Sequence, residues 1–241
     1  MTPRSRPPRG LFITLEGTEG CGKSTQAKLL GEHLRNQGYD TVETREPGGT
    51  PLAEKIRSLL LDRTDEPVAP ETEAFLVFAA RRQHVAQVIE PALARGSIVL
   101  CDRFIDSTLA YQGYARGLDI ATLERLNRLA THALMPDLTL VFDLPVSTGL
   151  ARRRSAAELN RLDRESLRFH RSVRTGFLDL AKRHPARIKV LSARTSKETV
   201  ARAVARAVTP MLGHIRRGVD HNRPAASRPS PQKSQARHAI R

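Results

Sequence analysis

Eight consecutive residues near the N-terminus have the composition and spacing of a phosphate-binding loop. They follow the pattern G-x-x-x-x-G-K-[ST], as Gly17, Thr18, Glu19, Gly20, Cys21, Gly22, Lys23 and Ser24. The backbone N–H groups of such a loop face inward on an anion, and the helix that follows adds positive potential behind them. Lys23 can reach the β- and γ-phosphates of a nucleotide, and the hydroxyl of Ser24 suits Mg²⁺. The sequence therefore predicts a site for a nucleoside triphosphate.

The segments around the loop are those that the motif requires. An apolar strand is predicted before it and an amphipathic helix after it, which disfavours the alternative of a chance match in a glycine-containing turn. The predicted strands cover residues 11–16, 40–45, 97–102, 138–143 and 187–191. The predicted helices cover residues 23–37, 51–61, 71–95, 119–133, 146–154, 163–184 and 196–212. This alternation predicts an α/β fold, a doubly wound five-stranded parallel sheet with helices on both faces and ligands at the carboxyl ends of the strands.

A carboxylate and a guanidinium follow the predicted strand 97–102. Asp102 stands where phosphate-loop enzymes place the acidic residue that holds the Mg²⁺ shell. Arg103 beside it can grip a phosphate through its planar fork of N–H donors. A surface ion pair is the alternative, but the neighbouring nucleotide site favours the functional interpretation.

A second strand, 40–45, ends in a sharp turn. The run Pro47-Gly48-Gly49 cannot continue regular structure. A plain turn accounts for these three residues but not for Arg45 and Glu46, which precede them.

An aromatic residue and an arginine share one face of the predicted helix 71–95. Phe78 is three residues before Arg81, so the two side chains are helical neighbours. An aromatic ring beside a guanidinium can stack on a base and bond to its edge. The alternative, in which Phe78 belongs to the core and the arginine faces solvent, stays open on spacing alone.

Arginines flank a polar segment between residues 150 and 165. The run at 152–154 and Arg161 together predict a short arginine-rich lid over bound phosphates. A solvated basic helix face is the alternative. The lid is favoured because the variable positions of the phosphate loop, 18–21, hold no arginine, and phosphoryl transfer needs a cation from elsewhere.

The net charge of +15 is concentrated at the two ends of the chain. Residues 1–9 form a basic extension, and residues 214–241 hold seven Lys and Arg residues against a single acidic residue, Asp220. The tail 214–241 lacks an apolar pattern and is predicted to be disordered, and contact with nucleic acid is not expected of it. Cys21 and Cys101 lie within motif and strand patterns, which favours a reducing cytoplasm over a disulfide framework. No apolar run is long enough for a membrane span.

Four stretches, at residues 12–25, 44–50, 99–113 and 135–140, resemble bacterial thymidylate kinase. The resemblance covers about residues 10–212, with the motifs in the order of the family. It implies transfer of the γ-phosphate of ATP to dTMP, giving dTDP and ADP, in the synthesis of dTTP. It also implies a homodimer, with Mg²⁺ accompanying ATP.

The same resemblance assigns roles on the phosphate side of the site. It places Glu19 near the sugar 3′-OH and the acceptor phosphate, and it places Arg57 and Arg103 on the phosphate of dTMP. Tyr111 would pack beside the sugar and disfavour a 2′-OH. Among the lid arginines, Arg161 matches best and would contact the phosphates during transfer.

On the base side, the resemblance implies that Arg81 reads the edge of thymine, with Thr108 and Gln112 completing the site. Some relatives place the base-stacking aromatic residue four positions before this arginine, and that position here is Val77. Phe78 would then take the stacking role from a shifted angle.

Two other function classes share some of these features. Another nucleoside or nucleotide kinase would share the phosphate loop and the Asp-Arg pair, but the stretches 45–49 and 108–112 argue against it. A nucleic-acid-binding protein would suit the basic tail. Aromatic residues make up only 4% of the chain and Trp is absent, so stacking platforms for bases would be scarce.

Overall fold

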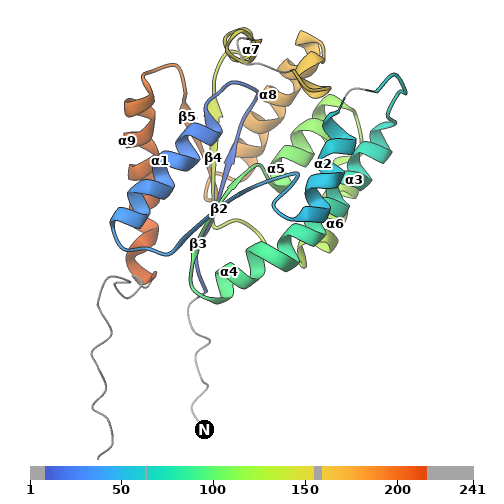
Figure 1. Ribbon diagram of the computed structural model, residues 1–241. Helices are drawn as coiled ribbons and strands as arrows, with labels where there is room; N and C mark the ends of the chain where they lie inside the picture. The colour runs from blue at the N-terminus through green and yellow to red at the C-terminus, as the bar shows by residue number, and fades with distance from the viewer. Residues whose placement is uncertain (1–8, 63, 155–158, 216–241) are drawn as a thin grey trace, which may run out of the picture.

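The computed structural model describes residues 9–62, 64–154 and 159–215. Five parallel strands form one sheet in the order β2-β3-β1-β4-β5, which confirms the predicted fold class (Figure 1). The strands are β1 Phe12–Glu16, β2 Thr41–Arg45, β3 Ile98–Asp102, β4 Leu138–Asp143 and β5 Ile188–Ser192. Because all five run the same way, their carboxyl ends meet at one edge of the sheet.

Alternate residues of the strands pack into separate layers on the two faces of the sheet. Ile13 and Leu15 face helices α1 and α9, whereas Phe12 joins a cluster with Val85 and Phe104 on the opposite face. Helices α1 Lys23–Asn36 and α9 Lys197–Val208 cover the first face. The second face is covered by α3 Pro70–His84, η1 Val85–Ile89, α4 Glu90–Ala94, α5 Ile105–Thr108, η2 Leu109–Ala115 and α8 Leu167–Arg183. The period of two in the strands therefore builds a sheet buried on both sides.

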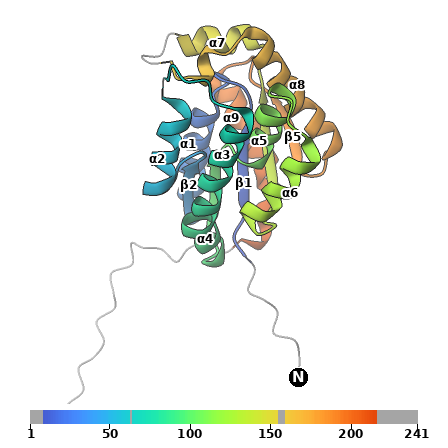
Figure 2. The same cartoon turned by 90° about the vertical axis from the view of Figure 1, so that its right-hand side faces the viewer.

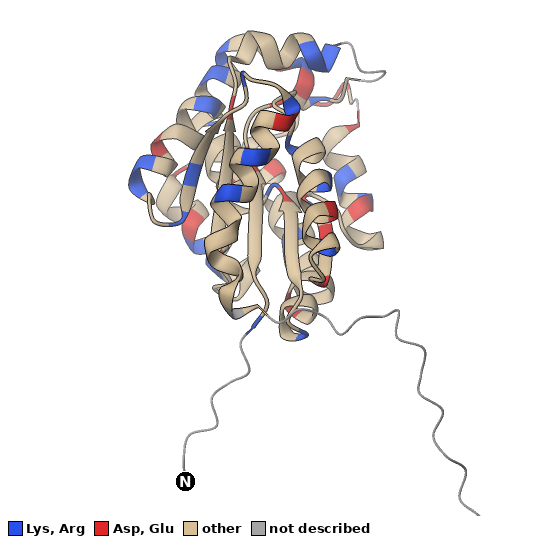
Figure 3. Cartoon of the chain, turned by 90° about the vertical axis from the view of Figure 1, so that its left-hand side faces the viewer, with Lys and Arg blue, Asp and Glu red and all other residues tan. Residues whose placement is uncertain are grey.

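The remaining helices lie outside these layers or over the edge that carries the strand ends. Helices α2 Pro51–Leu61 and α6 Ile120–Thr131 both pack on α3 (Figure 2). Helix α7 Val146–Arg154 follows β4 and ends in three arginines, which Figure 3 shows in blue beside the grey segment. The remaining helices in the described part of the chain are the short η3 Leu162–Arg164 and η4 Thr209–His214. None of these helices combines the length and the apolar character needed to cross a membrane.

Several predicted boundaries fall outside the described residues. Of the predicted lid, residues 155–158 are not described, and the basic extension and tail contribute only Arg9, His214 and Ile215 to the description.

The predicted helix 71–95 is continuous but contains a π-helical segment, Val85–Ile89. The helical run Ile105–Ala115 was not predicted. Residues 105–113 are all buried, so the run has no exposed face to set an amphipathic period.

A buried carboxyl group at the end of β1 holds the segment that follows β3. Glu16 Oε1 accepts the backbone N–H groups of Phe104 at 2.8 Å and Ser107 at 3.3 Å, and Ser107 Oγ lies 2.6 Å from Oε2. Burial, together with the charge of the nearby Asp106, raises the pKa of Glu16 from 4.5 to about 8. This carboxyl fixes the backbone just after Arg103 and so helps to place that arginine at the strand ends.

We expect Glu16 to make the stability of the protein depend on pH. The fold favours the protonated carboxyl, so the stability that this proton contributes is present below about pH 4.5 and is lost as the pH rises to about 8. Glu16→Gln carries a neutral side chain of the same shape and should not show this loss. Thermal melting of both proteins from about pH 5 to pH 9 tests this, and parallel curves for the two proteins would contradict it.

Candidate active site

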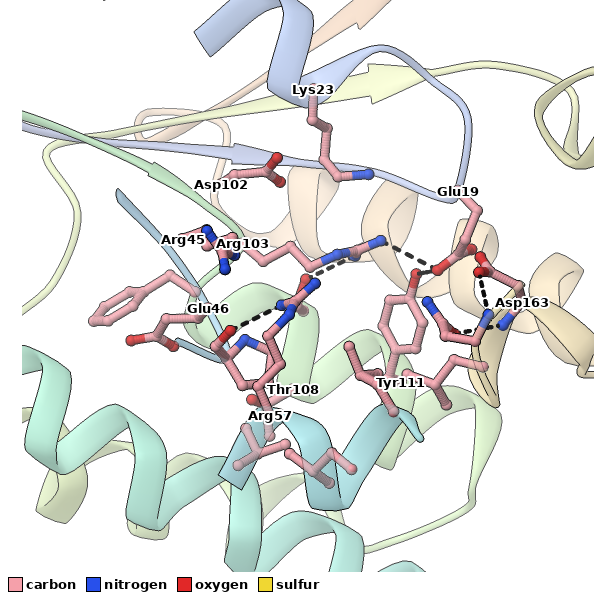
Figure 4. Close-up of a pocket in the computed structure, with 18 of the residues that line it drawn as sticks. Glu19, Lys23, Arg45, Glu46, Arg57, Asp102, Arg103, Thr108, Tyr111 and Asp163 are labelled. Atoms are coloured by element: carbon pink, nitrogen blue, oxygen red, sulfur yellow. Dashed lines mark hydrogen bonds and ion pairs between the residues drawn. The ribbon is translucent and has the colours of Figure 1, made fainter. Parts of the chain in front are cut away.

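A pocket of about 310 Å³ lies at the carboxyl ends of β1, β2 and β3 (Figure 4). Residues from the phosphate loop, from the ends of β2 and β3, and from helices α2, α3, η2 and α7 line it. Eleven of the residues predicted from the sequence are brought together there: Glu19, Gly20, Lys23, Ser24, Arg57, Arg81, Asp102, Arg103, Thr108, Tyr111 and Gln112.

The phosphate loop joins β1 to α1 as predicted. Gly22 caps α1 in the left-handed conformation, with φ 96°, which glycine adopts without steric cost. The ammonium group of Lys23 donates to the backbone carbonyls of Gly17 at 3.0 Å and Thr18 at 2.9 Å. Its positive charge therefore sits at the mouth of the loop, where anionic oxygen is expected to bind.

Ser24 and Asp102 form the pair of oxygen ligands that the sequence predicts. The Ser24 hydroxyl donates to Asp102 Oδ2 at 2.5 Å, so residues 78 positions apart meet at one point. Within the described residues no group of three or more His, Cys, Asp and Glu could hold a metal ion by itself. The pair still fits Mg²⁺, since that ion is commonly bound by one or two protein oxygens together with substrate phosphates.

The carboxylate of Glu19, which lines the pocket, contacts three side chains from different parts of the chain. It accepts the hydroxyl of Tyr111 and a guanidinium N–H of Arg103 at 3.2 Å (Figure 4). His170 Nδ1 lies 3.0 Å from its other oxygen. Burial alone would raise the pKa of Glu19, but the hydrogen bond from His170 and the charges of Arg103 and Lys23 lower it to about 2. Glu19 is therefore ionised, and it orients both Arg103 and Tyr111.

Arg103 takes a left-handed backbone conformation, with φ 73°, at the end of β3. This conformation is unfavourable for a residue with a Cβ. The backbone N–H of Arg103 donates to Leu15 O at 3.0 Å, and its guanidinium lies 4.8 Å from the ring centre of Tyr111. The strained turn aims a charged side chain back over the strand ends.

Arg81 lines the pocket and is almost fully enclosed by protein. Its side chain is 1% exposed, and four N–H···O bonds hold it in one position. The acceptors are Glu46 Oε2 at 2.7 Å, Asn127 Oδ1 at 2.6 Å, Thr108 Oγ1 at 2.8 Å and Phe104 O at 3.0 Å. A guanidinium has five N–H donors, so one remains for a ligand.

Outside the phosphate loop, two predicted residues, Phe78 and Arg161, do not line the pocket, and within the loop Gly17, Thr18, Cys21 and Gly22 do not line it either. Phe78 packs in the hydrophobic core, and its neighbour Val77 lines the pocket instead. Arg161 donates to Glu73 Oε2 at 2.7 Å and to Leu60 O at 2.9 Å. The lid arginine that lines the pocket is Arg153, which pairs with Asp163 at 2.9 Å.

The sequence reasoning missed the partners that orient the predicted residues. Glu73, Asn127 and His170 are buried, and they come from three different helices, α3, α6 and α8. No local motif marks them, since each meets its partner from a distant part of the chain. Glu46 stood out only as a residue beside a turn.

The phosphate loop packs directly against the start of the lid helix. A Cβ added to Gly20 would lie 2.0 Å from Gly149 O, and one added to Gly149 would lie 2.3 Å from Glu19 O. Only glycine at both positions permits this close approach of two backbones.

Comparison with known proteins agrees with this geometry. A sequence model of the family described as thymidylate kinase matches residues 15–204. A thymidylate kinase of Ectopseudomonas mendocina is 57% identical over 184 residues, covering 76% of this chain and 88% of the relative. One from Thermomicrobium roseum is 55% identical over 207 residues, covering 86% and 98%.

A solved structure agrees with them. The crystal structure of thymidylate kinase from Ehrlichia chaffeensis superimposes with a TM-score of 0.68 at 36% identity, covering 84% of this chain and 99% of that one. Given the match to the family model over most of its length and identities above one half to curated members, the chain belongs to the thymidylate kinase family.

Proposed function

We propose that the protein transfers the γ-phosphate of ATP to dTMP, giving dTDP and ADP for dTTP synthesis. The observation that carries this proposal is that one pocket combines a phosphate-binding loop with a group of side chains suited to a base. The phosphate loop lies at one end of it, and the enclosed Arg81 with Thr108 and Gln112 lies at the other. Membership of the thymidylate kinase family supports the same assignment.

The pocket supplies the charge that brings two anions together. Lys23 serves the phosphates of ATP, and Arg57 and Arg103 serve the phosphate of dTMP. Ser24 and Asp102 would hold Mg²⁺, which neutralises the donor phosphates when it is bound. The acceptor is a phosphate oxygen that is already largely ionised, so positioning and charge stabilisation suffice without a strong general base.

The base and sugar are recognised by neutral contacts and one guanidinium. Arg81, fixed by its four protein acceptors, has one donor left for a carbonyl oxygen of the base. Tyr111, held by Glu19, packs where it disfavours a 2′-OH. Phe78 is not part of this proposal, because its ring lies in the core.

A panel of nucleoside monophosphates with ATP tests the function. We expect dTMP to be the preferred acceptor, dUMP to be weaker, and UMP, CMP and AMP to be poor, since Arg81 and Gln112 suit a thymine edge and Tyr111 disfavours ribose. Coupled measurement of ADP release gives kcat/KM for each acceptor. A preference for AMP, or for a nucleoside without phosphate, would end this proposal.

We propose that the lid supplies positive charge to the transition state through Arg161 and Arg153. Arg161→Ala and Arg153→Ala should each lower kcat by about tenfold to a thousandfold with a smaller change in KM for dTMP, because a contact made mainly in the transition state affects kcat. Arg206→Ala removes an exposed charge from α9 and serves as the control. A loss confined to KM would mark the arginine as a substrate clamp instead.

We propose a homodimer that buries the outer surface of three neighbouring helices. Leu59 on α2, Phe75 on α3 and Leu129 on α6 are 66%, 61% and 72% exposed, and both α2 and α6 pack on α3. Large apolar side chains gathered in this way are typical of protein interfaces.

The two cysteines are free and buried, which suits the proposed cytoplasmic location.

Placing a charge in this surface should separate the subunits. Phe75→Glu would bury an unpaired carboxylate in the interface, so we expect sedimentation at micromolar concentration to change from dimer to monomer. Val190→Glu, at a 45% exposed apolar residue on β5, is the matched control. An unchanged dimer in Phe75→Glu would move the interface elsewhere.

A further inference from the structure

Glu73 lies beside the base side of the pocket, and its carboxylate is fully occupied by donors. Its side chain is 2% exposed. Oε1 accepts Gln112 Nε2–H at 2.8 Å and Arg116 Nε–H at 3.4 Å, and Oε2 accepts Arg116 at 3.1 Å and Arg161 at 2.7 Å. Glu73 and Gln112 both line the pocket, whereas Arg116 and Arg161 stand behind the carboxylate.

The two guanidinium groups keep Glu73 charged despite its burial. Burial alone would raise the pKa of this carboxyl, but the hydrogen bonds from Arg116, Gln112 and Arg161 hold the pKa below its usual value. An ionised carboxylate accepts hydrogen bonds and cannot donate them. Whatever faces Glu73 must therefore present a donor.

This requirement fixes the orientation of the Gln112 side chain. An amide has a donor end and an acceptor end, and a flipped Gln112 would place its carbonyl oxygen against the Glu73 carboxylate. The –NH₂ group consequently points to Glu73, and the carbonyl Oε1 is the end turned away from it. Gln112 is 4% exposed and has little room to adopt other positions.

We propose that Glu73 is a positioning residue that selects the base of the acceptor, by holding Gln112 with its carbonyl oxygen toward the ring. A carbonyl acceptor suits a pyrimidine with an N–H at ring position 3, which thymine and uracil have. Cytosine presents a lone pair at that position and would meet the Gln112 oxygen acceptor to acceptor. The inference rests on the proposed function, since it assumes that the base of a nucleoside monophosphate binds in this pocket.

The discrimination between dTMP and dCMP tests this role. Glu73→Gln can donate to Gln112 as well as accept from it, so the Gln112 amide is released to turn either way. We expect the ratio of kcat/KM for dTMP to that for dCMP to fall by about tenfold, since one neutral hydrogen bond is worth about that factor. The ratio of dTMP to dUMP should stay unchanged, because both bases carry the same N–H.

Two further comparisons separate this role from a general disturbance of the site. Arg161 also loses a partner in Glu73→Gln, but a weaker lid affects both acceptors alike and cancels in the ratio. Glu165→Gln is the matched control, because Glu165 pairs with the same Arg116 at 2.6 Å and makes no contact with Gln112 in the described structure. In a Gln112→Ala background, Glu73→Gln should cause no additional fall in the ratio.

The possible outcomes distinguish the inference from the proposed function. If the unmodified protein does not phosphorylate dTMP, the proposed function fails. If the unmodified protein does phosphorylate dTMP, either of two results would overturn the inference. One is an unchanged ratio of kcat/KM for dTMP to dCMP in Glu73→Gln, and the other is an equal fall of this ratio when Glu73→Gln is made in the Gln112→Ala background. Should Glu73→Gln not fold, Glu73→Asp keeps the charge among the arginines but draws the carboxylate back from Gln112, and we expect a smaller fall in the same direction.

Discussion

Like charges repel one another, and this pocket holds several arginines in a small space because most of them have a carboxylate partner. Arg103 pairs with Glu19, Arg81 with Glu46, and Arg153 with Asp163. Buried charges are tolerated when they are paired and hydrogen-bonded. The positions of the buried acidic residues therefore decide where these arginines lie in the absence of substrate.

Arg57 is different. Its guanidinium donates to Pro47 O at 2.8 Å, and burial together with the positive charges of Arg45 and Arg103 lowers its pKa, although Glu54 and Asp102 act in the opposite direction. Binding an anion stabilises such a cation more than it stabilises a cation that already has a carboxylate close by. This suits the proposed contact of Arg57 with the phosphate of dTMP, where the incoming charge would replace the missing carboxylate.

The sequence predicted the framework of the site better than its interior. The five strands were placed within one residue at each end, and the three central ones, β1, β3 and β4, are mostly apolar runs that are almost fully buried. The arginines could be found by their position at strand ends or by resemblance, but their buried partners Glu46, Glu73 and Asn127 could not. A polar residue that meets its partner across 40 positions leaves no local period in the sequence. The stacking role was assigned to Phe78, but Val77, one position earlier, lines the pocket, and one step along an α-helix turns a side chain by about 100°.

The close contact between Gly20 and Gly149 would act as a pivot for α7. The backbone of α7 approaches the phosphate loop closely there, so we expect movement of the helix to be mainly a rotation about that point. Arg153 lies four residues farther along, about 6 Å at 1.5 Å per residue. On a lever of that length, a rotation of 10° displaces the arginine by about 1 Å, using the helical rise given above. A small rotation of α7 would thus be enough to make or break a hydrogen bond to a bound phosphate, without any shift of the phosphate loop.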